Sequence, residues 1–201
     1  MQRMPDSICR QVSPGARKSF DAGKPSIRNM AGLTLPELMI SLALLSLLAG
    51  LGLPSFNYLL RTQRASSAAY SLSTHFASAR IAAITQRVPV TVCPSIGDLR
   101  CSNTSDWSRG WIVYRDPQRR DQPAMPQDIL HEVNGPIHSS MRLISSTGRH
   151  RVRFQPSGLS GGSNLRVRIC AGEALLREVI VNNSGRIRTA QQEQSGQGCD
   201  D

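Results

Sequence analysis

The sequence lacks the short motifs that identify several common classes of enzyme. It contains only four histidines, and His131-Glu132 is followed by His138, a spacing that does not suit a zinc site on a helix. The stretch Gly158–Gly162 has no Gly-Lys-Ser/Thr, so it is predicted to be a hairpin loop and not a phosphate-binding loop. We therefore predict that the protein is not an enzyme and that it uses no cofactor and no metal.

Lysine is absent after Lys24, so every later basic residue is an arginine. The chain has 24 Lys and Arg against 14 Asp and Glu, a formal net charge of +10. Arginine binds phosphate and carboxylate groups through two parallel hydrogen bonds, so an all-arginine set of basic residues favours an anionic partner. A basic surface that only keeps the protein soluble is the alternative interpretation.

Charged residues are also absent from the apolar run between Leu38 and Leu60. A bilayer core of about 30 Å needs roughly 20 apolar residues, so this run is long enough to cross it once. The segment just before the run carries four basic residues against one acid, which predicts that this end stays in the cytoplasm and the later residues lie in the periplasm. They are Arg17, Lys18, Lys24 and Arg28, against Asp21. A cleaved secretory signal peptide is the alternative, but no good small-x-small cleavage site follows the run.

Glu37 lies at the start of this apolar segment, in the sequence Gly32-Leu33-Thr34-Leu35-Pro36-Glu37. A carboxylate in hydrocarbon is costly, roughly 2.5–3.5 kcal/mol at the centre of a membrane helix and less near its end, so it usually has a partner. Cleavage between Gly32 and Leu33 would create one, a new α-amino group on another subunit. It would also leave Glu37 in the first turns of a helix, where a negative charge suits the helix dipole.

These residues resemble the class III signal of type IV pilins and type II secretion pseudopilins. In that signal a Gly is followed by an apolar residue (usually Phe, here Leu33), then Thr, Leu, any residue and Glu. The resemblance implies that a prepilin peptidase cleaves after Gly32 and methylates Leu33, that Glu37 serves assembly with other pilins, and that Pro54 kinks the helix. The leader, residues 1–32, is longer than is usual in these families. A start codon downstream of Met1 therefore stays an open alternative.

The rest of the chain divides into a helical part and a β-rich part. The predicted transmembrane helix covers 33–60, and its amphipathic continuation covers 61–87, with Leu72 and Phe76 among the apolar residues at helical spacing. Residues 88–201 have the pattern of short strands and turns. The candidate strands are 88–93, 110–115, 129–133, 141–145, 151–155, 165–171, 175–182 and 186–189. We predict an α+β fold, with a long N-terminal helix packed on an antiparallel sheet as in type IV pilin-like proteins.

Three motifs of the β-rich part carry a narrower resemblance: the Cys93–Cys101 loop followed by Asp106-Trp107 and Gly110-Trp111-Ile112-Val113; Phe154-Gln155-Pro156-Ser157-Gly158; and Gly185-Arg186-Ile187-Arg188. With these motifs the chain resembles the GspH/FimT group of minor pilins and pseudopilins. The Gly-Arg-x-Arg motif is linked to DNA binding in the FimT branch, which points to Arg186 and Arg188. Arg166 and Arg168 alternate along a predicted strand and so share a face, and we include them as candidates. The alternative is a solvated sheet face.

The cysteine pattern is consistent with an oxidising compartment. Cys9 lies in the leader and is expected to be lost, and the four that remain allow three pairings. We favour Cys93–Cys101 and Cys170–Cys199. Free thiols or a metal site are the alternatives, but Cys170 and Cys199 lie far apart in the sequence and no histidine lies near them at ligand spacing.

Two functions remain open from the sequence. In the first, the protein is a minor pilin that binds double-stranded DNA without sequence preference and serves DNA uptake. In the second, it is a pseudopilin of type II protein secretion that binds no DNA. Both predict a filament subunit of the bacterial inner membrane with its C-terminal domain in the periplasm. Trp107 and Trp111 could stack on bases, but we predict that they pack inside the domain.

Overall fold

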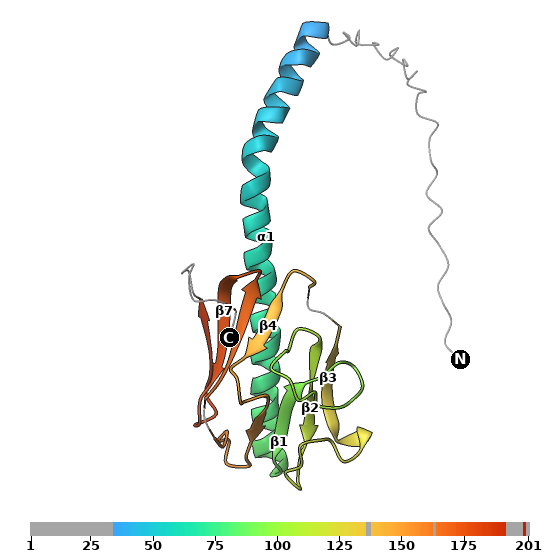
Figure 1. Ribbon diagram of the computed structural model, residues 1–201, viewed down its shortest axis with the longest axis vertical. Helices are drawn as coiled ribbons and strands as arrows, with labels where there is room; N and C mark the ends of the chain where they lie inside the picture. The colour runs from blue at the N-terminus through green and yellow to red at the C-terminus, as the bar shows by residue number, and fades with distance from the viewer. Residues whose placement is uncertain (1–33, 136–137, 163, 192–198, 200–201) are drawn as a thin grey trace, which may run out of the picture. The chain divides into compact units, whose positions relative to one another are not determined.

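The computed structural model describes residues 34–135, 138–162, 164–191 and 199, without the side chains of residues 51–55. These residues form one long helix followed by antiparallel strands, as expected for the predicted α+β fold (Figure 1). The chain divides into two compact units, residues 1–46 and 47–201. The second unit contains every strand and the part of the helix that packs on them.

Helix α1 (Leu35–Gln86) covers the described part of the predicted transmembrane and amphipathic segments. Its first turn contains Glu37, and the amide of Leu38 donates to the carbonyl of Thr34. The helix ends because Arg87 adopts a left-handed φ of 55° and Pro89 cannot continue a helical hydrogen-bond ladder. Pro54 lies within this helix, and its predicted role in a kink stays a prediction.

The N-terminal part of α1 exposes a series of large apolar side chains. Among the described residues, no helix combines the length with the hydropathy that a membrane span requires. The crossing predicted over Leu38–Leu60 therefore stays a prediction. The exposed apolar residues of this part are Leu35, Leu38, Met39, Ile40, Leu42, Leu44, Leu45, Leu47 and Leu48.

All eight candidate strands are present, with ends that differ from the predicted ones by no more than two residues. A short 3₁₀ helix, η1 (Pro126–Asp128), precedes the third strand. The strands are β1 (Val90–Pro94), β2 (Gly110–Arg115), β3 (Ile129–Asn134), β4 (Arg142–Ser145), β5 (Val152–Phe154), β6 (Leu165–Ala171), β7 (Ala174–Val181) and β8 (Ile187–Gln191).

The strands form two sheets, where the sequence predicted one. The first sheet has the order β3-β2-β1-β5 and the second the order β4-β6-β7-β8, and all neighbours are antiparallel. The division arises because β5 pairs with β1, with Val90 opposite Phe154, although β4 and β6 are its neighbours along the chain. Periodicity assigns a segment to a strand but does not identify its partner.

The core of the second unit lies between α1 and the inner faces of both sheets. The face of α1 that contributes to this core is rich in alanine, whose small side chain lets the helix axis approach the strands closely. The buried residues of this face recur at helical spacing. They are Ala65, Ala68, Ala69, Leu72, Phe76, Ala79 and Ala83. Phe56, Leu59 and Ile84 share the predicted apolar pattern but are exposed, so the packed face extends only from Ala65 to Ala83.

Trp107 and Trp111 are fully buried in this core, which confirms that they pack inside the domain. The Trp107 ring contacts Phe76 edge-on, with 5.8 Å between ring centroids, and the Trp111 ring contacts His75 in the same manner and at the same distance. Neither indole is available to stack on a base.

Candidate anion-binding surface

The second sheet presents arginines on the face that points away from α1. In β6 the buried Leu165, Val167 and Ile169 alternate with Arg166 and Arg168, as the pattern predicts. Arg166 lies opposite Ile180 of β7, and Ile180 lies opposite Arg188 of β8. The sheet therefore brings Arg166 and Arg188 into one row across three strands, although they are distant in the sequence.

Arg166 is already paired within the chain. The Nη1 atom of Arg166 lies 3.3 and 3.2 Å from the two carboxylate oxygens of Glu178 on β7. Glu178 is two positions before Ile180, the residue opposite Arg166 in the strand register. The Glu178 side chain is only 4% exposed, against 51% for Arg166, so this pair compensates a buried negative charge. Arg168 lies opposite Glu178 and also interacts within the chain. Binding of DNA by Arg166 and Arg168 stays a prediction.

Arg186 and Arg188 differ from this pair because both are exposed and, among the described residues, neither guanidinium group meets a carboxylate within ion-pair distance. Arg186 immediately precedes β8 and Arg188 is its second residue, so two residues of extended chain separate their backbone positions by roughly 7 Å. Asn182 orders the turn before them, because its Oδ1 accepts the amide of Arg186 at 2.9 Å and its carbonyl accepts the amide of Gly185 at 2.8 Å.

Gly185 brings two of the sequence motifs together in space. It is buried with φ +73°, and a Cβ at this position would overlap the carbonyl oxygen of Gly158. Gly158 itself has φ +80°, and a Cβ there would lie 2.9 Å from Cδ1 of Ile84 on α1. The last residue of the Phe154–Gly158 motif and the first residue of the Gly-Arg-x-Arg motif are therefore in close contact, and only glycine fits either position.

The stretch Gly158–Gly162 also fits the Gly-x-Ser-x-Gly pattern of some serine hydrolases, although it was predicted only as a hairpin loop. In those enzymes the serine lies exposed on a sharp turn between a strand and a helix. Here Ser160 is fully buried between β5 and β6, and its hydroxyl donates to the carbonyl of Asn182 at 2.7 Å. The structure gives this serine a role in packing the loop against the turn before β8.

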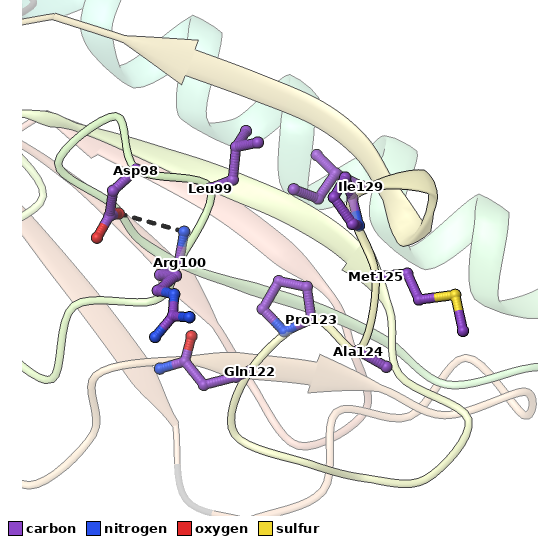
Figure 2. Close-up of a pocket in the computed structure, with 9 residues that line it drawn as sticks. Asp98, Leu99, Arg100, Gln122, Pro123, Ala124, Met125 and Ile129 are labelled. Carbon is purple, nitrogen blue, oxygen red and sulfur yellow. Dashed lines mark hydrogen bonds between the residues drawn. The ribbon is translucent and has the colours of Figure 1, made fainter.

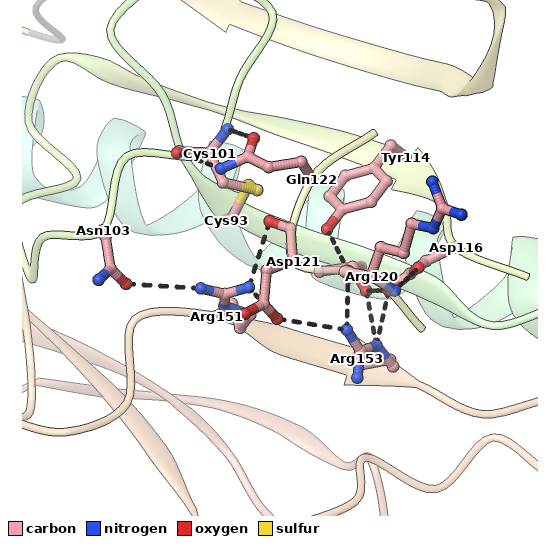
Figure 3. Close-up of polar contacts among 11 residues, drawn as sticks. Cys93, Cys101, Asn103, Tyr114, Asp116, Arg120, Asp121, Gln122, Arg151 and Arg153 are labelled. Atoms are coloured by element: carbon pink, nitrogen blue, oxygen red, sulfur yellow. Dashed lines mark hydrogen bonds and ion pairs between the residues drawn. A yellow bond between two sulfur atoms is a disulfide. The ribbon is translucent and has the colours of Figure 1, made fainter. Parts of the chain in front are cut away.

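A second group of arginines, Arg151 and Arg153, forms ion pairs with the connection between β2 and β3. Figure 3 shows Arg151 and Arg153 reaching from β5 and the residues before it toward this loop. Arg153 Nε lies 2.7 Å from Oδ2 of Asp116, and Arg151 Nη1 lies 2.5 Å from Oδ1 of Asp121. These arginines alternate along the strand as a phosphate-binding stripe would, but the structure shows that they hold the loop.

Asp116 is the centre of this network, and sequence reasoning missed it. The carboxylate is buried and accepts from Arg153, from Thr91 Oγ1 at 2.9 Å and from the amide of Arg120 at 2.6 Å. Burial, and secondarily the Asp116 charge, raise the pKa of Tyr114 to about 12, so its hydroxyl keeps the proton that it donates to the Arg120 carbonyl. An aspartate in a Pro-rich loop is expected to be exposed to solvent, and no local sequence pattern indicated that Asp116 would be buried.

Burial affects one further arginine near the second sheet. Desolvation lowers the pKa of Arg149, whose Nη2 donates to the carbonyl of Gly161 at 3.0 Å. This contact fastens the β4–β5 connection to the β5–β6 loop. Like Arg151 and Arg153, Arg149 therefore has a structural role within the chain.

A shallow groove of about 340 Å³ lies beside the β2–β3 connection (Figure 2). Asp98, Leu99 and Arg100 form one wall, and the segment from Gln122 to Pro126 with Ile129 forms the rest. Gln122 also fastens the loop to the disulfide region, because its amide exchanges two hydrogen bonds of 2.9 Å with the backbone of Cys101. In the part of the chain that the structure describes, no three His, Cys, Asp or Glu residues gather in a metal-binding arrangement.

Disulfides join Cys93 to Cys101 and Cys170 to Cys199, the pairing favoured from the sequence.

Of the predicted processing and assembly residues, Gly32 and Leu33 lie outside the described residues, and Glu37 is exposed in the first turn of α1. The structure thus brings Arg186 and Arg188 together with Arg166 on one sheet. It does not bring them to the second arginine group of the β2–β3 connection.

Comparison with known proteins agrees with the sequence motifs and the fold. A family model described as "Type II transport protein GspH" matches residues 68–185, and one described as "Prokaryotic N-terminal methylation motif" matches residues 27–53. No curated protein matches the sequence of this chain.

Solved structures of a minor pilin and of a minor pseudopilin are among those similar to this one. The type IV minor pilin FimU of Pseudomonas aeruginosa superposes with a TM-score of 0.52 at 19% identity, over 67% of this chain and 98% of that one. The minor pseudopilin EpsH of the Vibrio cholerae type 2 secretion system superposes with a TM-score of 0.47 at 12% identity, over 65% of this chain and 99% of that one. At this identity the likeness to FimU shows a shared fold.

Proposed function

Because this chain belongs to the type II transport protein GspH family, we propose that it is a structural subunit of a pilin-like filament, held in the bacterial inner membrane before assembly with its C-terminal domain in the periplasm. The exposed apolar side chains between Leu35 and Leu48 support this proposal, because such a surface needs lipid or other helices to cover it. The methylation motif at residues 27–53 supports cleavage after Gly32 and methylation of Leu33 by a prepilin peptidase.

Replacing Glu37 by alanine is expected to reduce incorporation of the subunit into filaments roughly ten- to hundredfold. The reason is the loss of a charge-assisted contact with the α-amino group of another subunit, worth about 1.5–3 kcal/mol. The measurement compares the amount of subunit in sheared filaments with the amount left in the membrane. Glu173→Ala, which removes an exposed carboxylate from the β6–β7 turn, is the matched control and should behave like the parent. Equal incorporation of both variants would contradict the assembly role of Glu37.

We further propose that the subunit binds double-stranded DNA through Arg186 and Arg188, without sequence preference, in the service of DNA uptake. One observation carries this proposal: the two guanidinium groups are exposed at the start of β8 and, among the described residues, have no carboxylate partner. Arginine forks suit phosphate oxygens, and binding that depends on phosphate alone does not read base sequence.

Titration of the full chain with duplex DNA at several salt concentrations tests this proposal. The chain is held in a non-ionic detergent, and an Arg186→Ala/Arg188→Ala variant is measured beside the parent. Each phosphate contact contributes about 0.9 to the slope of log K against log salt, so the variant should bind more weakly with a slope shallower by about 1.8. If the parent shows no salt-sensitive binding at low ionic strength, the proposed DNA binding is contradicted. The function that then remains is that of a pseudopilin that serves only type II protein secretion.

A further inference from the structure

Arg80 on α1 lies directly beneath the turn that begins the Gly-Arg-x-Arg motif. Its Nε would be 3.2 Å from a Cβ at Gly185 and 3.3 Å from a Cβ at Gly158. The arginine therefore occupies the space that the two glycines leave open. Its backbone is one turn before Ile84, which closes the other side of Gly158.

The Nε atom of Arg80 lacks the hydrogen-bond partner that a buried polar atom normally has. Within the described residues, no carboxylate forms an ion pair with Arg80. Buried polar atoms in folded proteins are almost always hydrogen-bonded, and a charge removed from water costs free energy unless it is compensated. The residue as a whole is only half-buried, so it is not sealed inside the core.

We propose that Arg80 is a third phosphate-binding residue, which acts together with Arg186 and Arg188 on the same DNA backbone. This inference rests on the proposed DNA binding. Gly185 joins the sites, because it contacts Arg80 on one side and is followed directly by Arg186 on the other. An anion bound at this turn supplies the compensation that Arg80 lacks within the chain, and the absence of a side chain at Gly158 and Gly185 keeps its guanidinium group within reach of the surface.

A purely structural role for Arg80 predicts different behaviour. In that case the aliphatic stem covers the two glycines and the charge is incidental, so a methionine of similar length would preserve the function. The phosphate-binding role requires the charge itself. The two roles are therefore separated by removing the charge while the stem is kept.

The test uses the full chain in non-ionic detergent, titrated with a fluorescent duplex of mixed sequence over a range of salt concentrations. Arg80→Met should reduce the slope of log K against log salt by about 0.9, the value for one phosphate contact, and Arg80→Lys should restore it. Combined with Arg186→Ala/Arg188→Ala, the reduction should reach about 2.7. Arg109→Met is the control of equal charge change, because Arg109 is exposed just before β2, at the opposite end of the first sheet from Gly158.

Each outcome is decisive. If the Arg186/Arg188 variant loses slope but Arg80→Met behaves like Arg109→Met, the inference fails and the proposed DNA binding stands. If the parent itself shows no salt-sensitive binding, both fail together. Should Arg80→Met not fold, Arg80→Gln, which keeps hydrogen-bonding capacity without charge, replaces it; a parent-like slope for Arg80→Gln overturns the proposal, and a slope shallower by about 0.9 supports it.

Discussion

Asp116→Ala is expected to lower the free energy of unfolding by about 3–5 kcal/mol, the range for breaking a buried ion pair by removing one partner. The substitution leaves Thr91, which is fully buried, without its carboxylate acceptor and removes the acceptor of the Arg120 amide. It also leaves the Arg153 guanidinium, 24% exposed, without its 2.7 Å partner. Urea unfolding followed by tryptophan fluorescence measures the effect, because both tryptophans lie in the core.

Asp121→Ala is the matched control for this prediction. Asp121 belongs to the same loop and pairs with Arg151 and, at 3.9 Å, with Arg153, but its side chain is 76% exposed against 2% for Asp116. Solvent and salt screen such a pair, so its loss should cost about 1 kcal/mol or less. Equal losses for the two variants would mean that burial of Asp116 does not set the strength of this network.

Removing the Cys170–Cys199 disulfide by alanine substitution is expected to cost roughly 3–4 kcal/mol in the chain-entropy model. The two cysteines are 29 residues apart in the sequence, so the bridge removes much of the freedom of the unfolded C-terminal chain. It also fastens residue 199 to β6, in a small cluster with the buried Leu175. Urea midpoints of the parent and of the Cys170→Ala/Cys199→Ala variant give the difference.

The Cys93–Cys101 disulfide provides the comparison within the same molecule. Its cysteines are only 8 residues apart, so the same model assigns it roughly 1 kcal/mol less than the longer bridge. Both bridges have buried sulfur atoms, which makes the lost packing similar. A larger loss for Cys93→Ala/Cys101→Ala than for the longer bridge would show that packing in the first sheet outweighs chain entropy here.

Much of the fold could be predicted because its signals are local. The helical spacing from Ala65 to Ala83 and the alternation in β6 depend only on the repeat of each element, so the eight strands and the helix followed from the residues themselves. Pro89 and the turn residues before Arg186 set the ends of elements for equally local reasons. The number of sheets was wrong, because the pairing of β5 with β1 joins residues about 60 positions apart, between which no local signal acts.

The candidate site divides in the same way. Alternation predicted correctly that Arg166 and Arg168 share a face, and the position of Arg186 and Arg188 after a turn indicated an exposed pair. Nothing local indicated that Glu178, one of two acids among nine arginines between Arg142 and Arg188, would reach Arg166 from the neighbouring strand. The same limit applied to Asp116 and Arg153, which are 37 residues apart.

The sequence by itself determined the order of the elements, the apolar and uncharged run from Leu38 to Leu60, and the basic character of the C-terminal half, because each follows from residue type and short-range spacing. Only the tertiary structure decided which arginines remain available to an anion. The pairing of β6 with β7 brings Glu178 within reach of Arg166, and acids of the β2–β3 loop bind Arg151 and Arg153. The contact of Gly158 with Gly185 places Arg80 beneath the motif. Charge compensation depends on distances of a few ångströms between residues remote in the chain, and only the fold sets those distances.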